Sequence, residues 1–218
     1  KIEPNNAVVC YNKAVLKYYQ YRNDLNDEAI KLFGLGMNST DINLRSRALC
    51  GLANAYSQKH GRYKTGKENL ETLLEAIDHA EKAAWLTARL DSAYKALAYA
   101  NHQYGEALAA LEDDNSGVHS NPEHRANKHR FLAEKYYKKA YKLNKEHYIS
   151  HNNLANLYLE WGMELPKSPT PDSLLKYWRL RISSFLSQKL VVDRDFLLRK
   201  AMQHCERAIE IYPSYHFA

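Results

Sequence analysis

The 218-residue chain has little of what strands, tight turns and cross-linked folds require. It contains only 8 Gly and 6 Pro, and no stretch alternates apolar and polar residues as a half-buried strand does. Its 3 Cys lack a CxxC spacing, so they imply no disulfide framework and fit a reducing compartment. No run of about 18 apolar residues is present, so the sequence predicts no transmembrane segment. We therefore expect a cytoplasmic protein.

The residue types that are abundant are those of a packed, helical protein. The chain is 45% hydrophobic, and its 17 Tyr and 3 Trp provide more buriable surface than a disordered chain carries. The formal net charge is +6, from 31 basic and 25 acidic residues. This mild excess of positive charge is compatible with an acidic partner but does not by itself indicate nucleic acid.

A triplet of small or aromatic residues at spacing i, i+4, i+7 occurs four times. The four triplets are Ala29/Phe33/Gly36, Ala76/Ala80/Ala83, Ala133/Tyr137/Ala140 and Ala201/Cys205/Ala208. This spacing places each triplet on one face of a helix, where small side chains allow a second helix to approach closely. Cys205 is expected to be buried as a small apolar residue.

Apolar periodicity predicts four helix pairs. The expected helices are 5–21 and 27–37, 42–60 and 70–84, 88–104 and 122–143, and 147–162 and 194–211. A turn is expected at residues 23–26, and a segment with a helical start and a polar loop is expected at 106–121. Between the last two helices, residues 171–190 predict an inserted helix with one broad apolar face and several basic residues.

The pattern resembles the tetratricopeptide repeat (TPR) family. In that family the first helix carries Leu and a small residue, an aromatic residue and Gly; the second carries the triplet and is followed by Pro. The fullest match is the series Leu154, Ala155, Tyr158, Gly162, Ala201, Cys205, Ala208 and Pro213. Another match has Asn101 in place of the aromatic residue. Adjacent triplets lie 47, 57 and 68 residues apart, whereas the plain repeat has 34.

The resemblance implies an all-α superhelical array of antiparallel helix pairs, with about four pairs plus inserted helices. We expect residues 1–218 to form a single domain with repeats at 5–40, 42–86, 88–145 and 147–212. The long repeats are similar to divergent bacterial TPR arrays attached to signalling enzymes and regulators. Because residues 213–218 read as the start of another repeat, we expect the chain to be a fragment of a longer protein.

The family binds an extended peptide or a partner helix in a groove lined by first helices. At 100° per residue, the faces opposite the core stripes predict six groove residues. They are Arg47, Asn54, Lys95, Tyr99, Asn152 and Asn156. We expect a non-enzymatic interaction or scaffold module whose partner is a protein or peptide, with basic side chains favouring an acidic segment. The full spacing of the family's clamp for a terminal carboxylate is not met.

Several alternatives remain open at this stage. The basic surface could bind nucleic acid, although mixed charges on most helices argue against it. The inserted helix could dock another chain or a membrane surface through Trp178, Arg179 and Ile182, or simply cover an edge of the array.

Catalytic and metal sites are not predicted. His147 and His151 stand four residues apart, and His119, His124 and His129 cluster in sequence, but neither group shows a complete set of metal ligands. We expect no metal, no cofactor and no catalysis, because no nucleophile, base and orienting group are placed together.

Overall fold

The computed structural model describes residues 6–19, 23–59, 67–112, 122–164 and 194–213. Within these ranges the protein forms eight α-helices and no strand, which confirms the all-α prediction. The helices are α1 (Ala7–Tyr19), α2 (Asn23–Gly36), α3 (Ile42–Lys59), α4 (Lys67–Leu86), α5 (Asp91–Glu112), α6 (Pro122–Leu143), α7 (Tyr148–Glu164) and α9 (Arg194–Ile211). None of these helices is long and apolar enough to cross a membrane. The predicted inserted helix at 171–190 lies outside the described residues.

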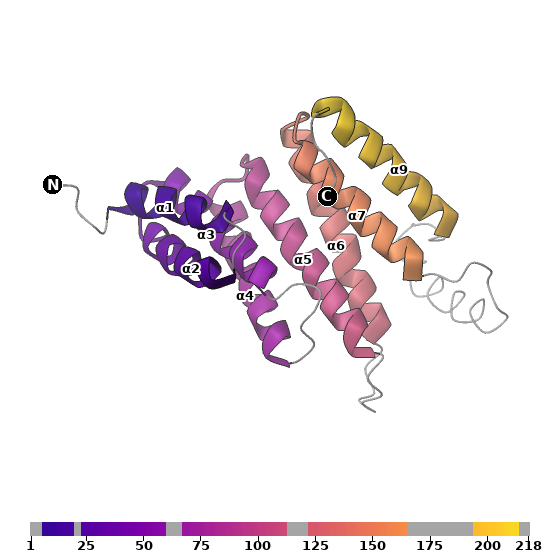
Figure 1. Ribbon diagram of the computed structural model, residues 1–218, viewed down its shortest axis with the longest axis horizontal. Helices are drawn as coiled ribbons and strands as arrows, with labels where there is room; N and C mark the ends of the chain where they lie inside the picture. Colours follow the sequence, from indigo (N-terminus) through magenta and orange to yellow (C-terminus); the bar gives the residue numbers. More distant parts are fainter. Residues whose placement is uncertain (1–5, 20–22, 60–66, 113–121, 165–193, 214–218) are drawn as a thin grey trace. The chain divides into compact units, whose positions relative to one another are not determined.

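The chain divides into two compact units, Lys1–Ser150 and His151–Ala218, here called the N-terminal and C-terminal units. In the N-terminal unit, α1 packs on α2, α3 on α4 and α5 on α6, so helices form neighbouring pairs (Figure 1). Successive pairs are joined by contacts of α2 with α3 and of α4 with α5. The first helices of the pairs, α1, α3 and α5, also contact one another in order.

The pairs of the N-terminal unit are antiparallel, as α5 and α6 show most fully. Near the start of α5, Tyr94 stacks on Tyr136 near the end of α6, with ring centroids 6.4 Å apart. Later in α5, Tyr104 meets the ring of His129, an earlier residue of α6, at 4.6 Å. The residue numbers therefore rise along one helix as they fall along the other.

The predicted triplets lie at the helix contacts. Eleven of the twelve triplet residues are buried, and Ala29, Ala76, Ala80, Ala83, Ala133, Tyr137, Ala140 and Ala208 are fully inaccessible. The exception is Cys205, which is partly exposed, so its predicted burial is wrong. Small residues serve close approach here: a Cβ on Gly36 would lie 3.2 Å from the Cβ of Ala48 in α3.

The buried part of the seam between α2 and α3 is apolar, whereas an exposed ion pair between Lys59 and Asp27 joins the two helices at the surface. The ring of Phe33 lies against the backbone of Gly51, where an added Cβ would come within 2.4 to 2.6 Å of three ring carbons. Tyr11 of α1 completes the contact, with its ring centroid 5.9 Å from that of Phe33. Glycine at position 51 is therefore required by the aromatic ring that covers it.

The seam between α5 and α6 carries buried polar pairs instead. Asn101 occupies the position of the repeat's aromatic residue, donates to the carbonyl of Leu97 at 2.8 Å and accepts from Nδ1 of His129 at 2.9 Å. Farther along, Nε of Arg130 donates to Oε1 of Glu106 at 3.0 Å, with side-chain exposures of only 4% and 15%. These two pairs link α5 to α6 through buried polar groups.

Within the C-terminal unit, the described residues of α7 pack against α9. A Cβ on Gly162 would lie 3.2 Å from the Cβ of Leu197, at the start of α9. At the other end, Nδ1 of His151 lies 2.9 Å from Nδ1 of His204, whose ring also stacks on Tyr158. This second antiparallel contact follows the predicted pairing of residues 147–162 with 194–211.

Most helix bounds lie within three residues of the sequence prediction, with two larger corrections. α6 and α9 begin and end where predicted, but α2 begins at Asn23, inside the segment 23–26 that was expected to be a turn. Asn and Asp are favoured at helix starts as well as in turns, so composition alone did not distinguish the two. α5 continues to Glu112, into the segment 106–121, because Leu108 extends its buried face.

Candidate functional site

Four of the six predicted groove residues lie on two contacting helices of the N-terminal unit. Arg47 and Asn54 lie on α3, and Lys95 and Tyr99 lie on α5. Arg47 is exposed and the other three are partly exposed. The charge of Arg47 acts on Tyr11 of α1: burial raises the pKa of Tyr11, and Arg47 partly opposes that rise. The four side chains therefore belong to the row formed by α1, α3 and α5.

The other two predicted groove residues belong to the C-terminal unit. Asn156 is partly exposed on α7. Asn152 is only 7% exposed, and its Oδ1 has no hydrogen-bond partner among the described residues. The residues proposed for a docking helix, Trp178, Arg179 and Ile182, lie outside the described residues. The candidate site is therefore built below from α3, α5 and the turn before α7.

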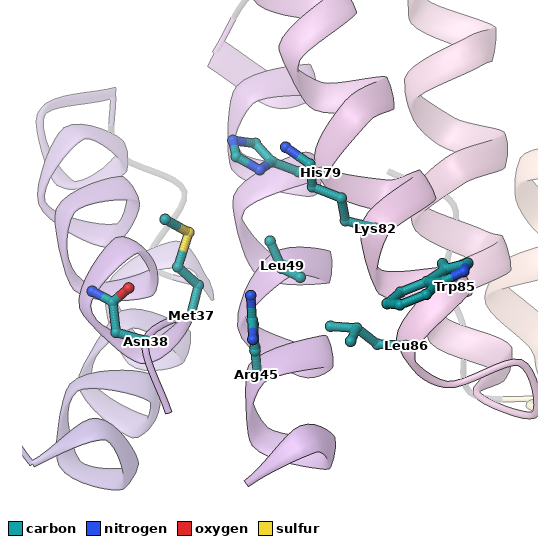
Figure 2. Close-up of a pocket in the computed structure, with 8 residues that line it drawn as sticks. All are labelled: Met37, Asn38, Arg45, Leu49, His79, Lys82, Trp85 and Leu86. Atoms are coloured by element: carbon teal, nitrogen blue, oxygen red, sulfur yellow. The ribbon is translucent and has the colours of Figure 1, made fainter. Parts of the chain in front are cut away.

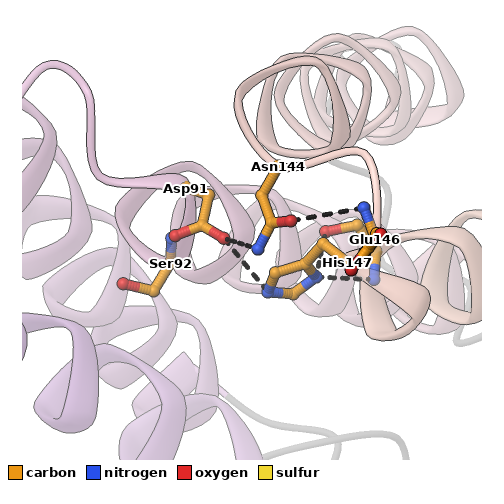
Figure 3. A network of polar contacts seen from close by, with 6 residues as sticks. Asp91, Ser92, Asn144, Glu146 and His147 are labelled. Carbon is orange, nitrogen blue, oxygen red and sulfur yellow. Dashed lines mark hydrogen bonds and ion pairs between the residues drawn. The ribbon is translucent and has the colours of Figure 1, made fainter.

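A polar cluster surrounds Asp91 at the start of α5 (Figure 3). One carboxylate oxygen accepts from the backbone N–H of Ser92 at 2.8 Å, and the other accepts from Nδ2 of Asn144 at 2.8 Å. Nε2 of His147 lies 3.8 Å from that second oxygen. Asn144 in turn accepts from the backbone N–H of Glu146 at 3.2 Å. The carboxylate of Asp91 thus joins the start of α5 to the turn that follows α6.

His147 stands between Asp91 and Ser150 in an arrangement that resembles a nucleophilic triad. Oγ of Ser150 lies 2.9 Å from Nδ1 of His147, but the backbone N–H of Ser150 also donates to that nitrogen at 3.1 Å. Ser150 is fully buried. A side chain that accepts from the backbone N–H three residues later caps a helix start. His147 therefore acts as the N-cap of α7.

Burial shapes the electrostatics of this region. It raises the pKa of the Cys50 thiol on α3 to about 12, which leaves the thiol protonated although a hydrogen bond from Ser92 and the charge of Lys95 oppose the rise. Burial also lowers the pKa of His147, and the positive charge of Lys95 lowers it further while Asp91 raises it. The imidazole is therefore favoured in its neutral form, as a capping acceptor requires.

Lys95 is the least compensated charge in the cluster. Burial lowers the pKa of its ammonium group, and nearby Cys50 and Asp91 only partly oppose this. Asp91 stands four residues earlier on the same helix, the spacing of a helical ion pair, but its oxygens are occupied by Ser92 and Asn144. Lys95 forms no ion pair or hydrogen bond with the part of the chain that the structure describes.

The histidine groups weighed as metal sites have other partners. The ring nitrogens of His147 face Ser150 and Asp91, whereas Nδ1 of His151 faces His204. His129 bonds to Asn101, and burial lowers its pKa to about 4. The side chains of His119 and His124 lie outside the described residues.

A pocket elsewhere in the N-terminal unit was not predicted from the sequence (Figure 2). It has a volume of about 300 Å³. Its lining residues are Met37, Asn38, Arg45, Leu49, His79, Lys82, Trp85 and Leu86. One signal could have found it: Trp85 stands about 200° around α4 from Ala83, opposite the small residues that face the core.

No protein-family model matches the chain, and no curated protein matches it.

Proposed function

We propose that this chain is a non-enzymatic interaction module of a TPR-like superhelix, in which the row of α1, α3 and α5 holds an extended acidic segment of a partner protein. Lys95 carries the proposal. A partly buried ammonium group without a partner is unfavourable, and a carboxylate from a ligand would offset that cost. The neighbouring Asp91 already accepts bonds from Ser92 and Asn144, and its charge offsets the burial of Lys95 only in part.

The side chains around Lys95 suit a peptide better than a small ion. Asn54 on α3 offers an amide that can donate to and accept from a peptide backbone, and Tyr99 adds a ring one turn beyond Lys95. Arg47 adds a second positive charge on α3. The contacts of α1 with α3 and of α3 with α5 make this row continuous, as binding of an extended segment requires.

The test begins with peptides selected from a random displayed library on the full chain. We expect the selected sequences to be rich in Asp and Glu. Lys95→Met should weaken their binding about tenfold or more, because a hydrogen bond to a charged group is lost. Asn54→Ala should weaken it less. Lys31→Met removes an exposed lysine from α2, outside the row, and serves as the matched control.

Two results would overturn the proposal. One is a set of selected peptides whose affinity is unchanged by Lys95→Met and by Asn54→Ala. The other is failure to select any peptide together with tight binding of single-stranded or duplex nucleic acid that weakens steeply with salt. The second result would establish the alternative of a nucleic-acid-binding repeat.

A further inference from the structure

The pocket lined by α2, α3 and α4 lies on a different face of α3 from the proposed peptide row. Met37 and Asn38 follow the end of α2, and Arg45 and Leu49 lie in the first half of α3. The remaining four lining residues come from the second half of α4 (Figure 2). Arg45 and Arg47 are two residues apart on α3 and so point about 200° apart around its axis.

Arg45 is a positive charge without a partner. It is exposed and forms no ion pair or hydrogen bond with any residue in the described ranges. Asp41 stands four residues earlier, but its carboxylate caps α3 by accepting from the backbone N–H groups of Asn43 at 2.8 Å and Leu44 at 3.4 Å. The guanidinium at the pocket is therefore available to a ligand, and its planar shape suits a carboxylate.

The second cation of the pocket is held only by an exposed ion pair. Lys82 pairs with Asp78, one turn earlier on α4, and the two side chains are 58% and 53% exposed. A pair of this kind between exposed residues contributes little to stability. Lys82 can therefore turn to an anionic ligand at little cost.

The apolar side of the pocket is unusually open at Trp85. Its exposure of 84% is the largest among the exposed large hydrophobic residues of the described ranges, although it lies in a regular helix. Leu49, only 4% exposed, and Leu86 line the same pocket. An exposed indole beside apolar lining and an unpartnered arginine is typical of a binding surface, because aromatic residues and Arg are enriched at such surfaces.

His79 adds an unsatisfied polar atom. Its Nδ1 is buried and has no hydrogen-bond partner within the described residues, while its ring stacks on Tyr56 with centroids 5.8 Å apart. Burial lowers the pKa of His79, so its ring is favoured in the neutral form. The exposed amide of Asn38 gives the pocket a group that can donate to and accept from a peptide backbone.

We propose that this pocket is a second binding site, for an acidic peptide segment that carries one large apolar side chain. The apolar side chain lies against Trp85, Leu49 and Leu86, and flanking carboxylates bond to Arg45 and Lys82. Charge complementarity favours an acidic peptide, since Arg45 has no partner among the described residues and Lys82 is only weakly paired. A volume of about 300 Å³ suits one anchoring side chain, because it is at the lower end of the range for ligand pockets.

The experiment uses the full chain and short synthetic peptides with Phe flanked by Asp and Glu. Two control peptides replace Phe by Gly or replace all Asp and Glu by Asn and Gln. Affinity is measured by fluorescence anisotropy, and the tryptophan emission is followed in parallel, with Trp85→Ala as the reference for the contribution of Trp85. We expect saturable binding of the acidic Phe peptide, a shift of the indole emission to shorter wavelength, and affinity at least about tenfold weaker for both control peptides.

Variants then locate the site. Arg45→Glu and Trp85→Ala should each weaken binding about tenfold or more, with unchanged denaturant midpoints because both side chains are exposed. Lys13→Glu makes the same charge change at an exposed lysine of α1 and should leave the affinity within about twofold. Lys95→Met separates this pocket from the peptide row and should also leave the affinity unchanged.

Three results would overturn the pocket proposal. They are the absence of saturable binding up to about 1 mM peptide, equal binding of the peptide that lacks Phe, and binding that is lost in Lys95→Met but not in Arg45→Glu. The last of these would place acidic peptides on the row of first helices, so the proposed function would stand while the second site would not. Normal binding in Lys95→Met with loss in Arg45→Glu would support the pocket alone.

Discussion

The α2–α3 seam and the α5–α6 seam join helices of the N-terminal unit in two different ways. In the first, the buried ring of Phe33 lies directly on Gly51, and the ion pair between Lys59 and Asp27 is exposed. In the second, Asn101 bonds to His129 and Glu106 pairs with Arg130, all within the described helices α5 and α6. One seam is held by shape and the other by matched polar groups.

The two seams are expected to fail in different ways. An apolar seam resists added atoms, because protein interiors are close-packed and extra atoms force side chains or backbone to shift. A buried polar pair resists loss of either partner, because the remaining group is left without a partner in a low-dielectric environment. Four predictions follow from this difference, ordered from the largest expected effect to the smallest.

Glu106→Ala should be the most destabilising change, because it leaves the buried guanidinium of Arg130 without its carboxylate. We expect a loss of about 3–5 kcal/mol in the free energy of unfolding. The double variant Glu106→Leu/Arg130→Met should be more stable than Glu106→Ala, since it removes both charges together. Urea denaturation is measured for the native chain, Glu106→Ala, the single variants Glu106→Leu and Arg130→Met, and the double variant. A double variant as unstable as the sum of Glu106→Leu and Arg130→Met would show that the pair is not coupled.

Gly51→Ala should destabilise the apolar seam by about 1–3 kcal/mol, because the new methyl group meets the ring of Phe33. Gly34→Ala provides the matched control on α2, since a Cβ there meets nothing within 4 Å. That variant should gain about 0.5–1 kcal/mol from lower backbone entropy. Thermal unfolding of both should give shifts of opposite sign, and a stabilised Gly51→Ala would mean that the ring of Phe33 moves aside freely.

The polar seam should respond to acid through His129. Its folded-state pKa of about 4 lies below the ordinary value of about 6.5, so between these values the unfolded chain binds a proton that the folded chain does not. Stability is therefore full above about pH 6.5 and falls as the pH drops toward about 4. Replacing His129 by Gln should reduce the loss of stability between pH 7 and pH 5, as measured by denaturant midpoints.

Gly105→Ala should have the smallest effect. A Cβ at this position would lie 3.2 Å from the carbonyl oxygen of Ala126 and 3.4 Å from Cγ of Arg130, a looser contact than that at Gly51. The strain should nearly offset the gain in helix propensity, which is about 0.5–1 kcal/mol. A loss as large as that of Gly51→Ala would show that the polar seam is packed as tightly as the apolar one.

The face of α2 that enters the apolar seam could be predicted from the sequence, because its signal is local, whereas its partner Gly51 on α3 was not predicted. Ala29, Phe33 and Gly36 lie within two turns of one helix, so their spacing alone places them on one face. The polar seam could not be predicted in the same way. Glu106 and Arg130 are separated by 24 residues, and nothing in the local pattern of either helix identifies the other as its partner.

The candidate site also has features that the local sequence pattern predicts and features that depend on residues distant in sequence. Helical geometry placed Arg47, Asn54, Lys95 and Tyr99 on faces away from the core, and all four have exposed or partly exposed side chains. What makes Lys95 distinctive is that Asp91 bonds elsewhere, and this depends on Asn144, which is distant in sequence. At Arg45 the cause is local, because the neighbouring Asp41 caps the start of α3 through the backbone N–H groups of Asn43 and Leu44.

The three cysteines offer a way to follow local opening of the protein. Cys10 and Cys50 are 1% and 5% exposed, on α1 and α3, whereas Cys205 on α9 is partly exposed. A thiol-reactive dye therefore labels Cys205 first, without any engineered cysteine. Modification of Cys10 and Cys50 then requires α1 or α3 to detach, so its rate measures how often the first helices separate from the unit. In the native chain, Cys205 therefore serves as a labelling position, and Cys10 and Cys50 report local opening of α1 and α3.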